Sequence, residues 1–293
     1  MTPALGSEPF GIVASRLRTD EKRILEAMDR RGVAYAYLDS RTLWHTLQQH
    51  RPERKQIVLN REIGQARAAA AARALEAAAA LVVNSAQAIE TCGDKYRSSV
   101  ALRDAGLPTP VTVLALTPDA ALDALESIGY PAVVKPLVGS WGRRVARLRD
   151  REGAEAVLEH IAALPSPAAH IVYLQKYISG PDRDIRAIVI GDEPIGAAYR
   201  RGPGWRHNVA RGADMTAFPP SPELADLAVM ATRAVGADIA GVDLIEDSDG
   251  RLHVLEVNHG VEFSGFQESL GDRVSVAERI VDHLVTRHRS CSG

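Results

Sequence analysis

The first part of the chain alternates short apolar runs with an amphipathic segment. Residues 10–16 (FGIVASR) and 34–39 (AYAYLD) are apolar runs typical of strands. Between them, residues 19–32 carry apolar side chains at helical spacing, with Thr19 or Asp20 as the expected N-cap. This β-α-β beginning predicts a small parallel sheet and places the protein in the α/β class.

The chain divides into three predicted segments. Residues 1–88 are expected to form an N-terminal α/β domain, 89–167 a central segment and 168–293 a C-terminal segment. The boundary near residue 167 falls in the Pro- and Ser-rich stretch LPSPAAH. The last segment holds further apolar runs between two amphipathic helices, so sheets covered by helices are expected there as well.

Three polar side chains interrupt the last two apolar runs. Residues 241–245 and 252–258 predict two strands joined by the turn-like EDSDGR, with Asp243 on the first. Glu256 and Asn258 lie two residues apart on the second, so they share a face that Asp243 can oppose. These residues could be strand-end polar groups on a solvated face. An acid inside an apolar strand is costly to bury without a partner, however, and the three oxygens suit Mg²⁺.

Cations stand where a phosphate site would need them. Lys135 ends the apolar run YPAVVKP, and Lys95 lies upstream in a helical pattern, where a solvated lysine is the ordinary alternative. A short loop follows Lys135 and could fold over phosphates with its backbone N–H groups, although two glycines often only mark a hairpin. This loop comprises Gly139, Ser140, Trp141 and Gly142.

More polar residues follow downstream. Residues 181–193 predict a strand with Asp184 and Arg186 on one face. Each arginine taken alone is more simply explained as part of a surface ion pair. The further candidates are Arg200, Arg201, Arg206, Asn208 and Arg211.

The order of these motifs resembles the ATP-grasp superfamily in its RimK-like branch. Within that branch VVNSAQAIETCGDKYRSSVALRDAGLPTP, KPLVGSWGR and EVNHGVEF are similar to the LysX/ArgX group. The resemblance runs from about residue 10 to about residue 285. It implies an ATP-grasp fold, with an N-terminal pre-ATP-grasp domain and two α+β subdomains holding ATP between them. The implied activity is ligation of an amino acid to the C-terminal glutamate of LysW, a small acidic amino-group carrier protein.

The resemblance also assigns roles to residues. Lys95, Lys135 and the loop from Gly139 to Gly142 would hold the ATP phosphates, and Arg186 and Arg201 would stabilise an acyl phosphate. Asp243, Glu256 and Asn258 would hold two Mg²⁺ ions. Position 176 is a lysine where relatives often carry an acid. The remaining nucleotide contacts would come from Gln175, Lys176, Tyr177, Ile178, Asp184 and Asn208.

The resemblance leaves the donated amino acid open. A Gly-Phe pair after Glu-Phe is typical of glutamate-specific members, and Gly265 and Phe266 match it, while Ser264 replaces the usual lysine. Glutamate is therefore expected, with α-aminoadipate as the alternative, and core packing is the alternative role for Phe266. The substrate walls would comprise Arg206, Asn208, His259, Gly260, Phe263, Gly265 and Phe266.

Composition narrows the class of protein. The chain has 293 residues and a net charge of −2, which argues against a nucleic-acid binder. Two cysteines make no disulfide framework, and no signal-peptide or membrane-spanning pattern is evident, so a cytoplasmic enzyme is expected. Relatives suggest a homodimer or homotetramer. The arginines between positions 143 and 149 are a candidate docking patch for an acidic carrier.

Two other functions remain open. The first is a RimK-type ligase that adds glutamate to a ribosomal protein or a peptide. The second is a non-catalytic ATP-binding protein of the same fold, which the intact lysines and metal-ligand candidates argue against.

Overall fold

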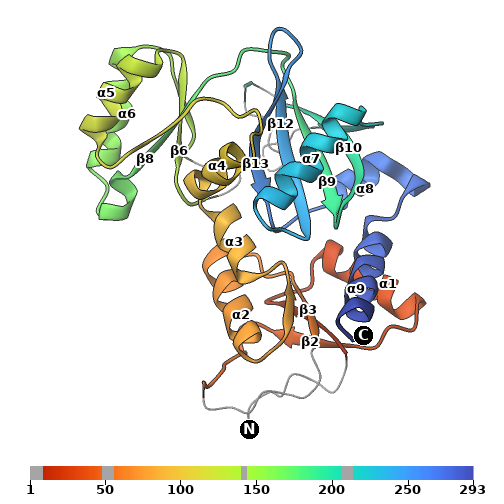
Figure 1. The fold of residues 1–293 in the computed structure, drawn as a ribbon. Coiled ribbons are helices and arrows are strands. Elements are labelled where there is room, and N and C mark those ends of the chain that lie inside the picture. The colour runs from red at the N-terminus through yellow and green to blue at the C-terminus, as the bar shows by residue number, and fades with distance from the viewer. Residues whose placement is uncertain (1–8, 48–55, 140–143, 203, 206–213, 293) are drawn as a thin grey trace.

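The computed structural model describes the whole chain except residues 1–8, 48–55, 140–143, 203, 206–213 and 293. It contains three sheets with helices packed against them, so the predicted α/β class is confirmed (Figure 1). Three of the candidate loop residues, Ser140, Trp141 and Gly142, lie outside the described residues, as do Arg206 and Asn208.

The N-terminal sheet is parallel, as the β-α-β pattern predicted. Its strand order is β2-β1-β3-β4. Helices α1 and α9 pack together beside this sheet, and α2 and α3 pack against each other. The alanine-rich α2 buries small side chains against the sheet. The elements are β1 (Phe10–Ala14), α1 (Thr19–Arg30), β2 (Tyr35–Asp39), β3 (Ile57–Asn60), α2 (Gln65–Ala77), β4 (Leu81–Val83), α3 (Ala86–Gly93) and α9 (Val276–Ser292).

The start of α1 differs from the prediction. Arg18, not Thr19 or Asp20, is the N-cap residue, and its backbone N–H donates to the Glu21 carboxylate at 3.0 Å. Asp20 and Glu21 are both buried. They lie on the face of α1 that also carries the buried Ile24 and Met28, so the apolar stripe of the helix continues into two acids.

The second sheet is small and antiparallel, with strand order β5-β8-β6-β7. Two helices cover one face of it and bury a separate apolar cluster. β8 follows the predicted boundary at residue 167 but pairs within this sheet. The two boundaries between the three segments stay predictions. The elements are β5 (Thr112–Ala115), α5 (Pro118–Ile128), β6 (Ala132–Pro136), β7 (Ala146–Leu148), α6 (Arg151–Ala162), η1 (Pro167–His170) and β8 (Val172–Lys176).

The third sheet has five strands in the order β11-β10-β9-β12-β13, all antiparallel. Helices α4 and α7 cover one face, and α8 contacts the edge strand β11. The elements are α4 (Lys95–Asp104), β9 (Asp184–Ile190), β10 (Glu193–Arg201), β11 (Asp214–Phe218), α7 (Pro222–Ala234), β12 (Ile239–Glu246), β13 (Leu252–Asn258), α8 (Ser264–Leu270) and η3 (Gly271–Arg273).

A buried amide joins the N-terminal sheet to the third sheet. Asn84 follows β4, and its side-chain nitrogen donates to the carbonyls of Ile239 at 2.7 Å and His259 at 2.9 Å. Its oxygen accepts the backbone N–H groups of Asp238 and Ile239. Because a buried amide is costly to leave unpaired, these four bonds fix where the start of β12 and the end of β13 meet the N-terminal domain.

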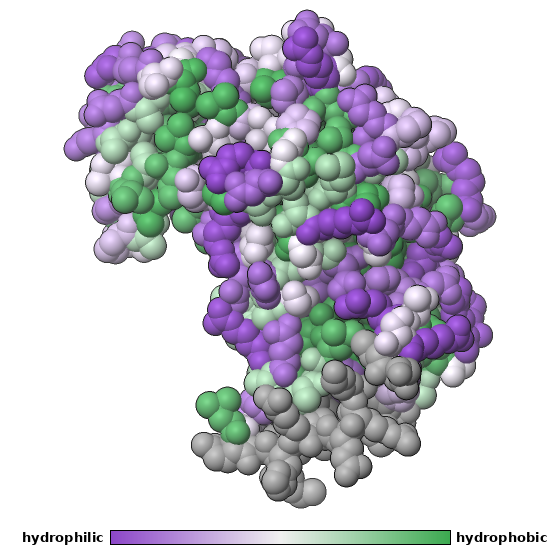
Figure 2. Space-filling model, in the orientation of Figure 1, coloured by the Kyte–Doolittle hydropathy of each residue, from purple (hydrophilic) through white to green (hydrophobic). Residues whose placement is uncertain are grey.

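The surface mixes polar and apolar residues. Figure 2 shows hydrophilic side chains at the tip of the β12–β13 hairpin and apolar patches between charged residues elsewhere on the same face. Among the described residues, no helix combines the length and the apolar character needed to cross a membrane.

Candidate active site

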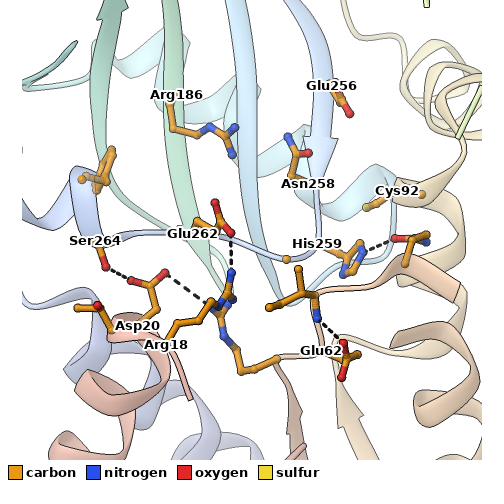
Figure 3. A pocket seen from close by; sticks show the side chains of 18 of the residues that line it. Arg18, Asp20, Glu62, Cys92, Arg186, Glu256, Asn258, His259, Glu262 and Ser264 are labelled. Atoms are coloured by element: carbon orange, nitrogen blue, oxygen red, sulfur yellow. Dashed lines mark hydrogen bonds and ion pairs between the residues drawn. The ribbon is translucent and has the colours of Figure 1, made fainter. Parts of the chain in front are cut away.

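Two cavities lie on the third sheet and meet each other. One, of about 200 Å³, is lined by β6, β8, β9, β12 and β13 and so lies between the second and third sheets. The other, of about 480 Å³, lies between the third sheet and the N-terminal domain (Figure 3). Gly139, Arg200 and Glu256 line both cavities, so the two spaces are adjacent at these residues, and we call this shared wall the junction. We call the two cavities the cleft and the charged cavity.

Two lysines face the cleft from different elements. Lys135 Nζ on β6 donates to the Gln175 side chain at 2.5 Å. Lys95 Nζ, at the start of α4, donates to the Gly139 carbonyl at 2.7 Å and lies 3.5 Å from Glu256. Burial lowers the pKa of Lys135 to about 8; Glu256 opposes this shift and Lys95 adds to it. Both amines are thus available to an anion entering the cleft.

The segment from Gln175 to Ile178, to which the resemblance assigns nucleotide contacts, lines the cleft. The Gln175 side chain is engaged by Lys135, and its nitrogen donates to Thr112 Oγ1 at 3.3 Å. Lys176 Nζ donates to the Ile128 carbonyl at 3.0 Å, near the C-terminal end of α5. Because this ammonium is held at the end of a helix, residue 176 presents its backbone rather than its charge to the cleft.

Aromatic rings lie at the same cleft. The Arg147 guanidinium lies 4.9 Å from the centre of the Tyr177 ring and 5.5 Å from that of Trp205. The two rings meet edge to face. Tyr177 and Trp205 both line the cleft, so this arginine of the candidate docking patch lies against two aromatic residues of the cleft wall.

The three metal-ligand candidates come together. Asp243 on β12 pairs directly with Glu256 on β13, and Asn258 Nδ2 lies 3.3 Å from Asp243 Oδ2. Asp243 Oδ1 is buried beside two guanidinium nitrogens, but neither is aligned to donate a hydrogen bond to it. Two carboxylates and an amide oxygen are hard ligands that fit Mg²⁺. The described residues contain no group of three or more His, Cys, Asp or Glu side chains placed for a metal, so a cation here would also need ligands from a bound phosphate.

Two arginines approach Asp243 from the neighbouring strands. Arg186 Nε on β9 lies 2.7 Å from Asp243 Oδ1, and Arg200 Nη2 on β10 lies 2.9 Å from the same oxygen. Gly241 permits this arrangement, because a side chain there would collide with the Arg186 guanidinium. Arg186 therefore lies at the metal-ligand candidates.

Arg200 was named from the sequence only as a further candidate, whereas the resemblance gave the acyl-phosphate role to its neighbour Arg201. Arg200 is 3% exposed, and its Nε donates to Asp184 at 2.5 Å, so Asp184 orients Arg200. Burial alone would lower the pKa of Arg200, but Asp243 and Asp184 outweigh it and raise that pKa above its ordinary value. Arg201 is exposed, lies near the Tyr199 ring and lines neither cavity.

His259 stands beside the charged cavity as a neutral ring. Its Nε2 lies 2.7 Å from Gln65 Oε1, and the nitrogen of the same amide donates to the Ile89 carbonyl. Burial lowers the pKa of His259 to about 4, and Arg61 adds to the shift. Nε2 therefore donates to Gln65, and the imidazole carries no charge at neutral pH.

The predicted substrate residues divide between cavity and core. Gly260, Gly265 and Phe266 line the charged cavity together with His259. Phe266 is 1% exposed and packs in the largest apolar cluster, so it serves the core as well. Phe263 is fully buried in the same cluster and is absent from the cavity wall.

A buried ionic network forms the other side of the charged cavity. Arg61 donates to Glu21 at 2.9 Å and to the Val261 carbonyl at 2.8 Å. Asp20 accepts the Phe263 N–H at 2.8 Å and the Ser264 hydroxyl. Helix α1 and the segment after β3 thus hold the loop that precedes α8. Sequence reasoning missed this network, although the helical spacing of Asp20 and Glu21 from Ile24 would have placed both acids on the buried face.

Comparisons with known proteins agree with this architecture. A family model described as the LysX preATP-grasp domain matches residues 10–91, and one described as the RimK-like ATP-grasp domain matches residues 92–284. The crystal structure of a RimK domain ATP-grasp protein from Sphaerobacter thermophilus superposes with a TM-score of 0.77 at 27% identity, covering 94% of this chain and 98% of that one. The fold is therefore the ATP-grasp fold, as the motifs implied.

Curated relatives narrow the class further. The glutamate–LysW ligase ArgX of Sulfolobus acidocaldarius is 31% identical over 280 residues, covering 93% of this chain and 96% of the relative. The α-aminoadipate–LysW ligase LysX of the same organism is 34% identical over 208 residues, covering 71% and 75%. The chain belongs to the RimK-like ATP-grasp family of ligases, which confirms the expected class of enzyme.

Proposed function

We propose that this enzyme joins the α-amine of glutamate, or of a similar acidic amino acid, to the γ-carboxylate of the C-terminal glutamate of a LysW-type carrier protein. ATP would supply the driving force through an acyl phosphate. The observation that carries the proposal is the junction of the two cavities at Arg200 and Glu256. A nucleotide in the cleft and an acid in the charged cavity would meet there.

The cleft supports nucleotide binding. Lys95 and Lys135 would hold the phosphates, and the backbone from Gln175 to Ile178 would hold the adenine. Lys135 is poised by partial desolvation, which strengthens its attraction to an anion. Asp243, Glu256 and Asn258 would hold Mg²⁺, as two ions, and the metal would neutralise phosphate charge when bound.

The reaction transfers one phosphoryl group and forms one amide. An oxygen of the carrier γ-carboxylate would attack the γ-phosphorus of ATP, and ADP would leave. The amine of the amino acid would then attack the acyl carbon, lose a proton, and release inorganic phosphate. The chain would supply positioning and charge stabilisation, and the candidates for this are Arg200, which lines both cavities, and Arg186 beside it in the charged cavity. Arg200 replaces Arg201 in this assignment because Arg201 is exposed and outside both cavities.

Glutamate is the first candidate for the donated amino acid. The relative of greatest coverage named above is a glutamate–LysW ligase, and Gly265 and Phe266 line the charged cavity. One methylene separates glutamate from α-aminoadipate, a difference worth about 1–3 kcal/mol in a hydrophobic pocket, so partial cross-reactivity is expected. We place the enzyme in the cytoplasm as a homo-oligomer.

Mass spectrometry of a carrier tests the proposal. A purified LysW-type carrier ending in glutamate is incubated with the enzyme, Mg²⁺, ATP and single amino acids. The carrier should gain one glutamate residue, together with stoichiometric ADP. A carrier truncated by its last residue is the matched control and should gain none. An unchanged carrier alongside extension of free peptides would support the RimK-type alternative.

A further inference from the structure

One guanidinium in the charged cavity has no part in the chemistry above. Arg18 caps α1 and lines the cavity. Its Nε and Nη2 donate to the two carboxylate oxygens of Glu21 at 2.9 and 3.0 Å. Glu21 is fully buried and is also held by Arg61. This two-pronged contact fixes the plane of the Arg18 guanidinium, so Nη1 is left to project in a set direction.

Glu262 accepts a hydrogen bond from that remaining nitrogen. Arg18 Nη1 donates to Glu262 Oε1 at 2.5 Å, and Figure 3 shows this pair in the cavity, on the side away from Glu256. The Glu262 side chain is 56% exposed, whereas that of Glu21 is 0% exposed. An exposed ion pair contributes little to stability, so the outer pair can open while the buried pair keeps Arg18 in place.

The charge balance around Arg18 includes one carboxylate that a ligand anion could replace. Arg18 and Arg61 balance the buried carboxylates Asp20 and Glu21, with which they form contacts of 2.9–3.6 Å. Glu262 adds a carboxylate that only Arg18 holds among the ion pairs of the described residues. A ligand carboxylate could therefore replace Glu262 on Nη1 without changing the local charge, while Glu262 turns to solvent.

We propose that Arg18 is a specificity-determining residue that binds a carboxylate of the donated amino acid, and that Glu262 competes with the substrate for this position. The inference rests on the ligase function proposed above and adds a carboxylate-binding position to it. The cavity spans from Arg18 and Glu262 to Arg186 and Glu256. An acidic amino acid held at Arg18 would extend its other end toward the reaction junction.

Opposite changes in KM test the competition. Arg18→Met should raise the KM for glutamate about 10- to 100-fold, since a charge-assisted hydrogen bond is lost. Glu262→Gln should lower the KM about two- to fivefold, because an exposed competitor is removed, with kcat changed less than about twofold. Glu268→Gln is the matched control: Glu268 is an exposed acid that faces Arg23 of α1 at 4.0 Å, and it does not line the cavity.

Substrate analogues identify the carboxylate that Arg18 binds. Glutamine lacks the side-chain carboxylate and glutamate α-amide lacks the other. The kcat/KM of the analogue that lacks the bound group should respond to neither substitution, and that of the other analogue should respond to both. A KM change for the carrier instead of glutamate would overturn the inference.

If Arg18→Met does not fold, Glu262→Gln alone tests the inference, because Glu262 is exposed and its substitution should leave the fold intact. An unchanged or raised KM in Glu262→Gln would show that the Arg18–Glu262 pair is only structural and would overturn the inference. The wild-type enzyme separates this failure from that of the proposed function. If the wild-type enzyme modifies the carrier and Glu262→Gln has an unchanged KM for glutamate, only the inference about Arg18 is overturned. If the wild-type enzyme modifies no carrier, the proposed ligase function is overturned.

Discussion

The cleft and the charged cavity are built from different kinds of sequence. Apart from Lys95 at the start of α4, the charged groups proposed to act in the cleft come from strands, where Lys135, Asp243 and Glu256 interrupt apolar runs. The charged cavity takes its own from a helix start, the residue after β3 and the loop after β13, which are far apart in the chain. The first kind of site shows in a local pattern, whereas the second exists only once the chain has folded.

The difference also separates two uses of charge. In the cleft, Lys95 and Lys135 donate to a carbonyl and an amide oxygen, and Lys95 also lies 3.5 Å from Glu256, the metal-ligand candidate. Around the charged cavity, Asp20, Glu21 and Arg61 are buried, and Arg61 forms an ion pair with each of the two acids. Groups of the first kind should affect turnover when changed, and groups of the second kind should affect stability and its pH dependence.

The largest expected effect is at Glu256. Glu256→Gln keeps the volume but removes the charge of a metal-ligand candidate that lines both cavities, so ADP formation should fall by roughly 10³-fold or more. A steady-state ADP assay at saturating Mg²⁺ measures this. Asp249→Asn, in the exposed turn of the same hairpin, is the control and should turn over normally. Normal turnover in Glu256→Gln would contradict the metal role of Glu256. It would also contradict the claim that the charged groups of the cleft affect turnover.

Adjacent arginines give the next largest contrast. Arg200→Met should lower kcat about 10²- to 10³-fold, because Arg200 connects Asp184 with Asp243 at the junction. Arg201→Met should change kcat less than about twofold, since Arg201 is exposed beside Tyr199. Equal losses in the two variants would contradict the assignment, and circular dichroism shows whether either loss reflects unfolding.

Two lysines of the same cleft give a smaller contrast. Lys135→Met should weaken binding of a non-hydrolysable ATP analogue by about 1.5–3 kcal/mol, the contribution of a charged hydrogen bond. Lys176→Met should bind the analogue within about twofold of the wild type, because its ammonium is held at the end of α5. Isothermal titration calorimetry distinguishes them. An equal loss at Lys176 would mean that its side chain leaves α5 to meet the nucleotide.

The pH dependence of stability gives the smallest effect and belongs to the charged cavity. Burial would raise the pKa of Glu21, but Arg18 and Arg61 outweigh it and hold that pKa below its ordinary value of 4.5. A carboxyl with a lowered folded-state pKa stabilises the protein above pH 4.5, and this contribution is lost as pH falls through the lowered value. Urea unfolding between pH 7 and pH 3 should show a shallower acid loss in Glu21→Gln than in the wild type. Parallel curves would place the acid sensitivity elsewhere.

The sequence predicted much of this arrangement, for reasons that particular residues make clear. Glu256 and Asn258 share a face because side chains alternate along a strand, and this needs no knowledge of the fold. The choice between Arg200 and Arg201 did need knowledge of the fold, because either side chain can point inward until the register of β10 on β9 is known. That register pairs Arg200 with Asp184 and turns Arg201 outward. The roles of Arg18 and Glu262, residues 244 positions apart, follow only from the packing of α1 against the loop before α8.

Capture of the activated acid tests the central claim most directly, since the proposal places the acyl phosphate on the carrier. Enzyme, Mg²⁺, ATP and carrier are incubated with hydroxylamine and no amino acid, and the products are mapped by tandem mass spectrometry. The account predicts ADP release and a hydroxamate on the C-terminal glutamate of the carrier, lost in Glu256→Gln. An unmodified carrier, with a hydroxamate forming instead on free glutamate when glutamate is supplied, would contradict it.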